Sequence, residues 1–139
     1  MSLKSFFSSS AIIPENKKVI ISNRFVENGK PIEWELRAIT EDENSKIRNA
    51  CTHTTKFKGQ STTEFDKNRY LAKLCAASVV FPDLKDAELQ KSYGVVGDGE
   101  VLMAMLLPGE FETLAEIAQD MNGFNLEQFE EKKEEVKNS

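Results

Sequence analysis

The chain has 139 residues, 40% of them apolar, and a formal net charge of −5 at neutral pH. This is the usual size of one domain. No stretch concentrates Lys and Arg enough to follow a phosphate backbone, so we expect no nucleic-acid partner. No apolar run approaches the ~20 residues that span a bilayer, so we expect no membrane partner.

The start of the chain, residues 1–7, lacks the continuous apolar region and cleavage site of a secretory signal. The two cysteines, Cys51 and Cys75, lie inside apolar patterns, where a free thiol behaves as a small hydrophobe. We therefore expect two buried, reduced cysteines and a location in the cytoplasm.

The N-terminal part is predicted to be rich in β-structure. Residues 1–16 are rich in Ser and are interrupted by Pro14, so they are expected to form a mobile arm. Residues 17–26 and 31–39 read as two strands of a hairpin around the turn Asn28-Gly29. In the second strand, alternate apolar residues share one face: Ile32, Trp34, Leu36 and Ala38.

A capping box at Thr40 and Glu43 predicts a short helix that continues to Cys51. The Thr- and Lys-rich segment from Thr52 to Phe65 reads as a second hairpin, expected at the edge of a sheet, where lysines deter further pairing.

From Asp66 onward the apolar period is helical. The expected helices run from Asp66 to Phe81-Pro82, from Asp86 to Gly94, from Asp98 to Pro108-Gly109, from Glu110 to Asn122, and from the cap Asn125 through Leu126 to Lys137. The order of elements predicts an α+β fold, with N-terminal β-hairpins followed by a mostly helical C-terminal half. We expect one domain over residues 17–124, followed by a charged helix or tail over residues 125–139.

The sequence offers little material for catalysis. His53 is the sole histidine, so neither a zinc site nor a Ser-His or Cys-His nucleophile has a full set of partners. The glycine-rich stretch Gly94–Gly99 lacks the lysine of a Walker loop and contains Asp98, which repels phosphate. The carboxylates lie at predicted helix starts or on solvated faces. We therefore expect no enzyme activity, no metal and no cofactor.

Aromatic residues and methionines at helix ends, together with a Phe pair on the arm, are the usual anchors of partner surfaces. The alternative for each residue is that the core buries it. The candidate partner-binding residues are Phe6, Phe7, Phe81, Leu84, Tyr93, Met103, Phe111, Phe124 and Phe129.

Several short apolar motifs resemble, in their order, the XkdN-like family of phage tail assembly chaperones. They are the Phe6-Phe7 pair, Trp34–Arg37, Val79–Leu84, Glu88–Val95, Met105–Phe111 with Leu114, and Asn122–Phe124. The resemblance implies a non-enzymatic protein of phages or prophages that binds and solubilises the tape measure protein and helps recruit subunits of the major tail protein. It also implies location in the cytoplasm of the bacterial host and absence from the mature virion.

The family often appends a second domain by frameshifting, so the partners extend to a frameshifted longer form of the protein itself. Lys132-Lys133 is a candidate site for the slippage. Self-association is left open. The alternative function is a small structural connector of the virion, or a regulatory adaptor that binds a host or virion protein. A hydrolase that uses clustered carboxylates is a distant third.

Overall fold

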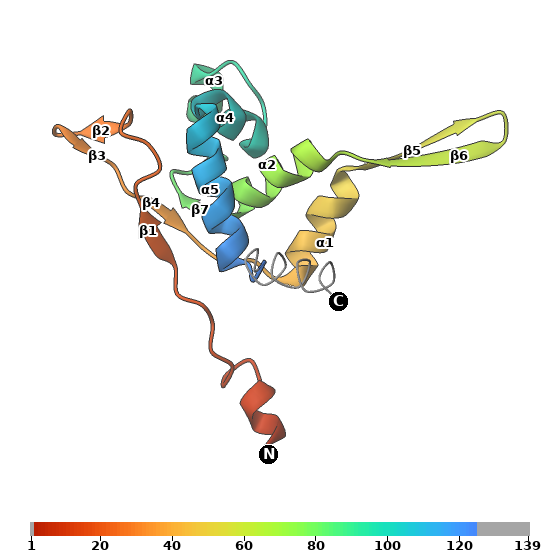
Figure 1. The fold of residues 1–139 in the computed structure, drawn as a ribbon, viewed down its shortest axis with the longest axis horizontal. Coiled ribbons are helices and arrows are strands. Elements are labelled where there is room, and N and C mark those ends of the chain that lie inside the picture. Colours follow the sequence, from red (N-terminus) through yellow and green to blue (C-terminus); the bar gives the residue numbers. More distant parts are fainter. Residues whose placement is uncertain (1, 125–139) are drawn as a thin grey trace, which may run out of the picture.

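The computed structural model describes residues 2–124 as an α+β fold in which short antiparallel strands precede most of the helices (Figure 1). The elements are a 3₁₀ turn η1 (Leu3–Phe6), β1 (Lys17–Val19), β2 (Val26–Glu27), β3 (Lys30–Pro31), β4 (Trp34–Leu36), α1 (Glu41–Ala50), β5 (Thr52–Phe57), β6 (Gln60–Phe65), α2 (Lys67–Ser78), β7 (Val79–Phe81), α3 (Ala87–Ser92), α4 (Asp98–Met105) and α5 (Pro108–Met121). The predicted fold class is confirmed.

A three-stranded antiparallel sheet, in the order β1-β4-β7, supports one side of the core. Trp34 and Leu36 of β4 point into the core and are buried, as the predicted alternation requires. The residue between them, Glu35, faces the other way and pairs with Lys18 of β1 and Phe81 of β7.

The first hairpin is confirmed at its turn, but its strands are shorter than predicted. Asn28 and Gly29 both adopt positive φ, and β2 pairs with β3 around them. Residues 20–25 are irregular, because the Ser22 hydroxyl accepts a hydrogen bond from the Arg24 amide and both side chains bind Glu110 of α5. These contacts replace a continuous ladder between residues 17–26 and 31–39.

The prediction that the helix of residues 66–81 continues to Phe81-Pro82 is wrong. Helix α2 ends at Ser78, and the next three residues form β7 on the free side of β4. The amide of Arg37 donates to the carbonyl of Ser78 at 2.8 Å, which extends the contact between the two segments.

The predicted starts of α1, α2 and α3 are confirmed. Thr40, Asp66 and Asp86 each accept a hydrogen bond from the amide three residues later, in α1, α2 and α3 respectively. Two boundaries differ from the prediction. Helix α4 ends at Met105, and α5 begins at Pro108 rather than Glu110, because proline is suited to the first position of a helix.

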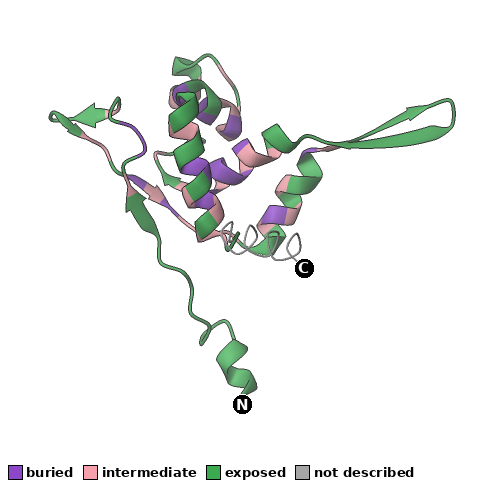
Figure 2. Cartoon of the chain, viewed as in Figure 1, coloured by how far each residue is buried: buried purple, intermediate pink, exposed green. Residues whose placement is uncertain are grey.

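The core lies where α2, α4 and α5 meet the sheet, as the burial colours in Figure 2 show. Its fully buried side chains come from the sheet and from all three helices: Trp34, Leu36, Leu74, Cys75, Val101, Leu102 and Leu114. Helix α1 contributes little, since Asn44 is its one buried residue among those described.

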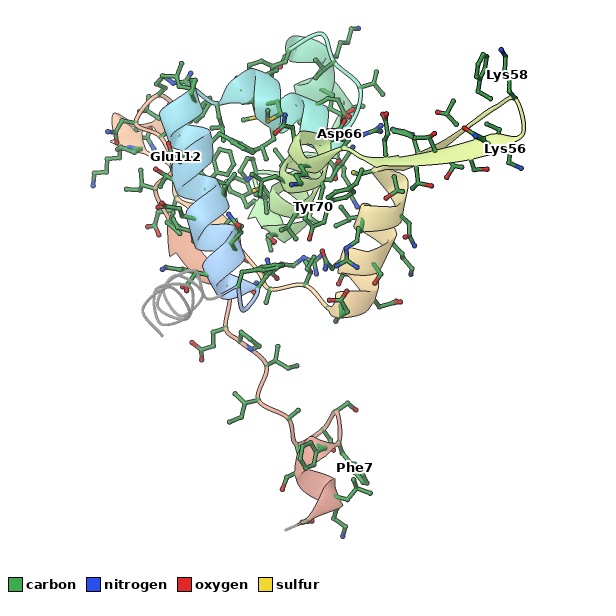
Figure 3. The ribbon with its side chains drawn as sticks, turned by 45° about the vertical axis from the view of Figure 1, so that its right-hand side comes forward. Phe7, Lys56, Lys58, Asp66, Tyr70 and Glu112 are labelled. Carbon is green, nitrogen blue, oxygen red and sulfur yellow. The ribbon has the colours of Figure 1, made fainter. Side chains whose placement is uncertain are left out.

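Two segments project from this core (Figure 1). Every residue from 2 to 18 is exposed, and the arm leads away from the body in line with β1. The hairpin β5–β6 projects on another side, with Lys56 and Lys58 near its tip (Figure 3). The prediction that this hairpin lies at the edge of a sheet is wrong, because β5 and β6 pair with each other alone within residues 2–124.

The final predicted helix, with its cap Asn125, the anchors Leu126 and Phe129 and the candidate slippage site Lys132-Lys133, lies outside the described residues.

Candidate protein-interaction surface

The arm presents the first two candidate residues. Phe6 ends the turn η1 and Phe7 follows it, and both side chains are exposed (Figure 3). Ile12 and Ile13 follow along the same arm and are also exposed, with 98% of the surface of Ile12 accessible. The arm therefore carries apolar surface that the core of the same molecule does not cover.

Phe81 and Leu84 are three positions apart in the chain but lie in different environments. Phe81 stands on the outer face of β7 and is half exposed. Leu84 is only 3% exposed and belongs to the core, so the expectation that it anchors a partner is not supported. Leu84 instead forms part of the floor of an open cavity.

We name this cavity the β7 groove. It has a volume of about 460 Å³ and lies beside the start of β7, with α1 as its opposite wall. Its apolar lining consists of Ile47, Ala76, Ala77, Val79 and Leu84. Charged side chains also line it, from α1, α2 and α4, from the residue after β4 and from the loop after β7: Arg37, Glu43, Lys46, Lys73, Asp83, Lys85 and Asp98.

A second cavity, which we name the α2–α4 groove, contains Met103. It has a volume of about 500 Å³ and runs between the facing sides of α2 and α4. Ala72 and Gly99 form its small-residue floor, and the side chain of Met103 is 51% exposed beside them. Ala72 and Gly99 are buried, and the aliphatic part of Lys73 lies over Gly99, so Met103 is the exposed apolar side chain among the lining residues. A thioether adapts to differently shaped apolar partners.

Lys73 lines both grooves. Its ammonium group lies 3.1 Å from both Asp98 and Glu100. Burial alone would lower the pKa of Lys73, but the hydrogen bonds that its ammonium donates to these two carboxylates outweigh this effect, so the pKa is raised. Lys73 is therefore charged and held in place at neutral pH, and it fixes α2 against α4.

The remaining candidates are distributed over other parts of the surface. Phe124 is partly exposed beside the start of α1, where it lines a notch with Asn122. Phe111 packs against the core and is half buried. Tyr93 is exposed after α3. The structure thus brings the candidates into separate areas rather than one patch, and Phe129 lies outside the described residues.

The sequence reasoning missed β7 and the apolar lining around it. Val79 and Val80 continue the apolar stripe of α2, so periodicity alone assigns them to that helix. The β-branched pair before Phe81-Pro82 was the available signal for a strand.

The groups considered for catalysis are dispersed. His53 lies exposed on β5 opposite Glu64 of β6. Cys51 and Cys75 are both free and buried. Burial raises the pKa of both thiols, that of Cys75 to about 12, which disfavours the reactive thiolate. Within residues 2–124 no three His, Cys, Asp or Glu side chains gather in a way that could hold a metal ion.

None of the helices between residues 2 and 124 combines the length and apolar character needed to cross a membrane.

Known proteins are similar to this chain over nearly its whole length. The family model "Phage XkdN-like tail assembly chaperone protein, TAC" matches residues 3–137. The chain is 30% identical over 139 residues to the "Phage-like element PBSX protein XkdN" of Bacillus subtilis strain 168, a match that covers 98% of this chain and 93% of that protein. It is also 30% identical over 134 residues to YqbN of the same organism, covering 93% and 90% of the two chains.

A crystal structure of YqbN superimposes with a TM-score of 0.77 at 28% identity, over 90% of this chain and 98% of that chain. The match to the family model includes the arm, the sheet and the helices that line both grooves. The chain belongs to the XkdN-like family of phage tail assembly chaperones.

Proposed function

We propose that this protein binds the tape measure protein of its phage or prophage, keeps it soluble before the tail tube forms, and helps to recruit subunits of the major tail protein. It acts in the cytoplasm of the bacterial host, without catalysis, and leaves before the virion is complete. Family membership supports the general role. The α2–α4 groove is the observation that supports a place for the tape measure protein.

The chemistry of this groove suits an apolar helical ligand. A partner helix needs a shallow, open channel with an apolar floor, and the α2–α4 groove offers Ala72, Gly99 and Met103 in that arrangement. The polar groups at its rim, Arg69 and Glu100 among them, stay in contact with water when a helix lies between them.

The family resemblance implies that the tape measure protein is a long, exposed apolar helix, and such a helix would present different apolar faces to the flexible side chain of Met103. A single rigid pocket recognises one sequence, whereas an exposed methionine packs against several shapes. The acidic net charge of the chaperone adds solubility to each complex that forms.

The test is co-expression of the tape measure protein with tagged wild-type protein or with Met103→Glu, followed by pull-down. A charge on the groove floor opposes the burial of an apolar helix, so Met103→Glu is expected to reduce the amount of tape measure protein recovered. Val96→Glu is the matched control, because Val96 is also exposed and lies outside this groove. Equal recovery with both variants would exclude the α2–α4 groove as the binding site.

Mass spectrometry of purified particles distinguishes the chaperone from the structural connector. We expect no peptides of this protein in mature virions, whereas a connector remains in them at a fixed copy number.

A further inference from the structure

We propose that residues Ala11–Ile13 of the arm of one molecule add as a strand to the free edge of β7 in a second copy of the chain. This strand exchange goes beyond the proposed function, because it involves no tape measure protein. It rests on two complementary features that do not contact each other within residues 2–124: a sheet edge without a partner strand, next to a groove, and an uncharged apolar segment that these residues leave exposed.

The acceptor is the outer edge of β7. The sheet order β1-β4-β7 leaves one side of β7 without a partner strand within residues 2–124. Exposed edges are normally protected by charged residues or proline. The opposite edge, β1, begins with Lys17-Lys18, and each of the other described strands except β7 contains a charged residue or histidine. β7 consists of Val79, Val80 and Phe81, so no residue of the strand itself carries a charge.

The space beside this edge can receive side chains. Val79 at the start of β7 lines the β7 groove, and so do Ala77, which precedes the strand in the chain, and Leu84, which follows it. Ile47 of α1 lines the opposite wall, and charged side chains such as Lys73, Asp83 and Lys85 share the lining. A strand that adds to a sheet gains affinity from its backbone hydrogen bonds and specificity from pockets for alternate side chains. The volume of about 460 Å³ is large enough for a branched aliphatic side chain of an added strand.

The donor has the matching chemistry. The segment from Phe7 to Pro14 carries no charge, and its Ile12 and Ile13 are exposed in the free molecule. Isoleucine favours strands, and a residue that precedes proline, as Ile13 does, is biased towards extended backbone. Side chains alternate along a strand, so one isoleucine would enter the groove while the other packs near Val80 and Phe81.

The position of the arm favours a second copy over the arm's own molecule. The arm joins the sheet at β1, and β4 lies between β1 and β7. To reach its own β7 edge, the arm would have to reverse and pass around β4. In Figure 1 the arm leads directly away from the sheet.

Disulfide trapping between two single-cysteine variants tests the exchange. Full-length Ile12→Cys and a larger, tagged Val80→Cys are mixed, oxidised and separated on a non-reducing gel, so that mixed dimers have their own mobility. The native Cys51 and Cys75 are fully buried and do not interfere. The matched control replaces Val80→Cys by Val26→Cys, at another exposed valine in a strand.

Docking of the arm holds the two thiols at an effective concentration near millimolar, so mixed dimers with Val80→Cys should exceed those with Val26→Cys by about tenfold. Equal yields from the two mixtures would overturn the proposal. A double variant, Ile12→Cys with Val80→Cys, tests whether the arm binds its own molecule. A disulfide within one chain of this variant, with no reaction in the mixture of single variants, would also overturn the proposal.

Sedimentation velocity gives a second measurement that needs no cysteine. The average mass of the wild type should rise with protein concentration. Val80→Lys should abolish the rise, because a charged lysine at the edge of the sheet disfavours the addition of another strand. Val26→Lys should leave it unchanged. Strand exchange would be refuted if the wild type and both folded variants stayed monomeric at all concentrations. That result would leave the proposed binding of the tape measure protein unaffected.

Discussion

Glu110 accepts four hydrogen bonds from three residues. Arg24 binds it through two nitrogens, the Ser22 hydroxyl and the Leu107 amide also donate to it, and Arg24 in addition reaches the carbonyl of Met105 at 2.6 Å. These bonds join the irregular segment after β1 to the corner between α4 and α5. A few polar side chains thus hold elements that are far apart in the sequence.

The Glu110 site predicts a specific pH dependence of stability. The hydrogen bonds from Arg24, then from Ser22 and the Leu107 amide, lower the pKa of Glu110 from 4.5 to about 2. A lowered pKa in the folded state stabilises the protein fully above the unfolded value, and this stabilisation is lost as the pH falls towards 2.

The measurement is the melting temperature of the wild type and of Glu110→Gln between pH 7 and pH 2. The wild type should melt at the higher temperature at pH 7, and the difference should narrow below pH 4.5. A difference that stays constant over the whole range would show that the charge of Glu110 does not contribute.

Asn122 forms a second polar clamp at the end of α5. Its Oδ1 accepts a hydrogen bond from the Ile39 amide at 2.7 Å, and its Nδ2 donates to the Ser78 hydroxyl at 2.9 Å and to the Ala118 carbonyl at 2.8 Å. Ser78 is fully buried. Asn122→Ala would leave these partners without their bonds and should lower the free energy of unfolding by about 2 kcal/mol.

Denaturant unfolding checks this value, with Asn49→Ala as the control. Asn49 is exposed on α1, so its replacement should change the free energy of unfolding by less than about 0.5 kcal/mol. Equal effects of the two substitutions would contradict the role of Asn122.

At the scale of elements, the hairpin β5–β6 contributes little to the core. All of its residues except Thr52 are exposed, and an isolated two-stranded hairpin is marginally stable in water. Its base is fixed by Phe65, whose ring centroid lies 5.4 Å from that of Tyr70, and by the hydrogen bond from Tyr70 to Asn44 (Figure 3). The rest of the hairpin extends into solvent.

The hairpin can therefore be shortened without loss of the fold. Replacing residues 54–63 by Asn-Gly joins the paired residues His53 and Glu64 through a turn that suits a hairpin. The free energy of unfolding should change by less than about 1 kcal/mol, since the removed side chains are exposed. Loss of a cooperative transition in thermal unfolding would mean that the projecting strands stabilise the fold.

Local chemistry made several elements predictable from the sequence. Asn28-Gly29 supplies the positive φ angles of a tight turn, and Thr40, Asp66 and Asp86 cap helices through their own side chains. The alternation of Trp34 and Leu36 identifies the buried face of β4. Each of these signals depends on neighbouring residues alone, so it can be read from the sequence.

The errors concern contacts between distant segments. The pairing of β7 with β4 ends α2 at Ser78, and the binding of Ser22 and Arg24 to Glu110 interrupts the first hairpin. Neither partner is visible from local sequence. The same holds for the candidate site, because Leu84 matches the pattern of an exposed helix-end residue but packs into the core, while the groove around it arises from three separate segments.

At the scale of the whole molecule, a small core carries two projecting segments and two open grooves. Family membership identifies the protein with phage tail assembly, and exposed apolar surface is the usual property of a protein that binds others. Large apolar residues are exposed on the arm, on the hairpin and around β7, so different surfaces are available for different partners. This separation would allow the two proposed interactions, strand exchange between copies and binding of the tape measure protein, to occur together.

The most direct test of the account is the soluble fraction of the tape measure protein expressed with and without this protein. Coverage of an apolar ligand prevents its aggregation, so co-expression should move the tape measure protein from the pellet to the supernatant, where the two proteins should co-elute in size-exclusion chromatography. A tape measure protein that is equally insoluble in both cases, or soluble but never associated with this chain, would contradict the proposed function.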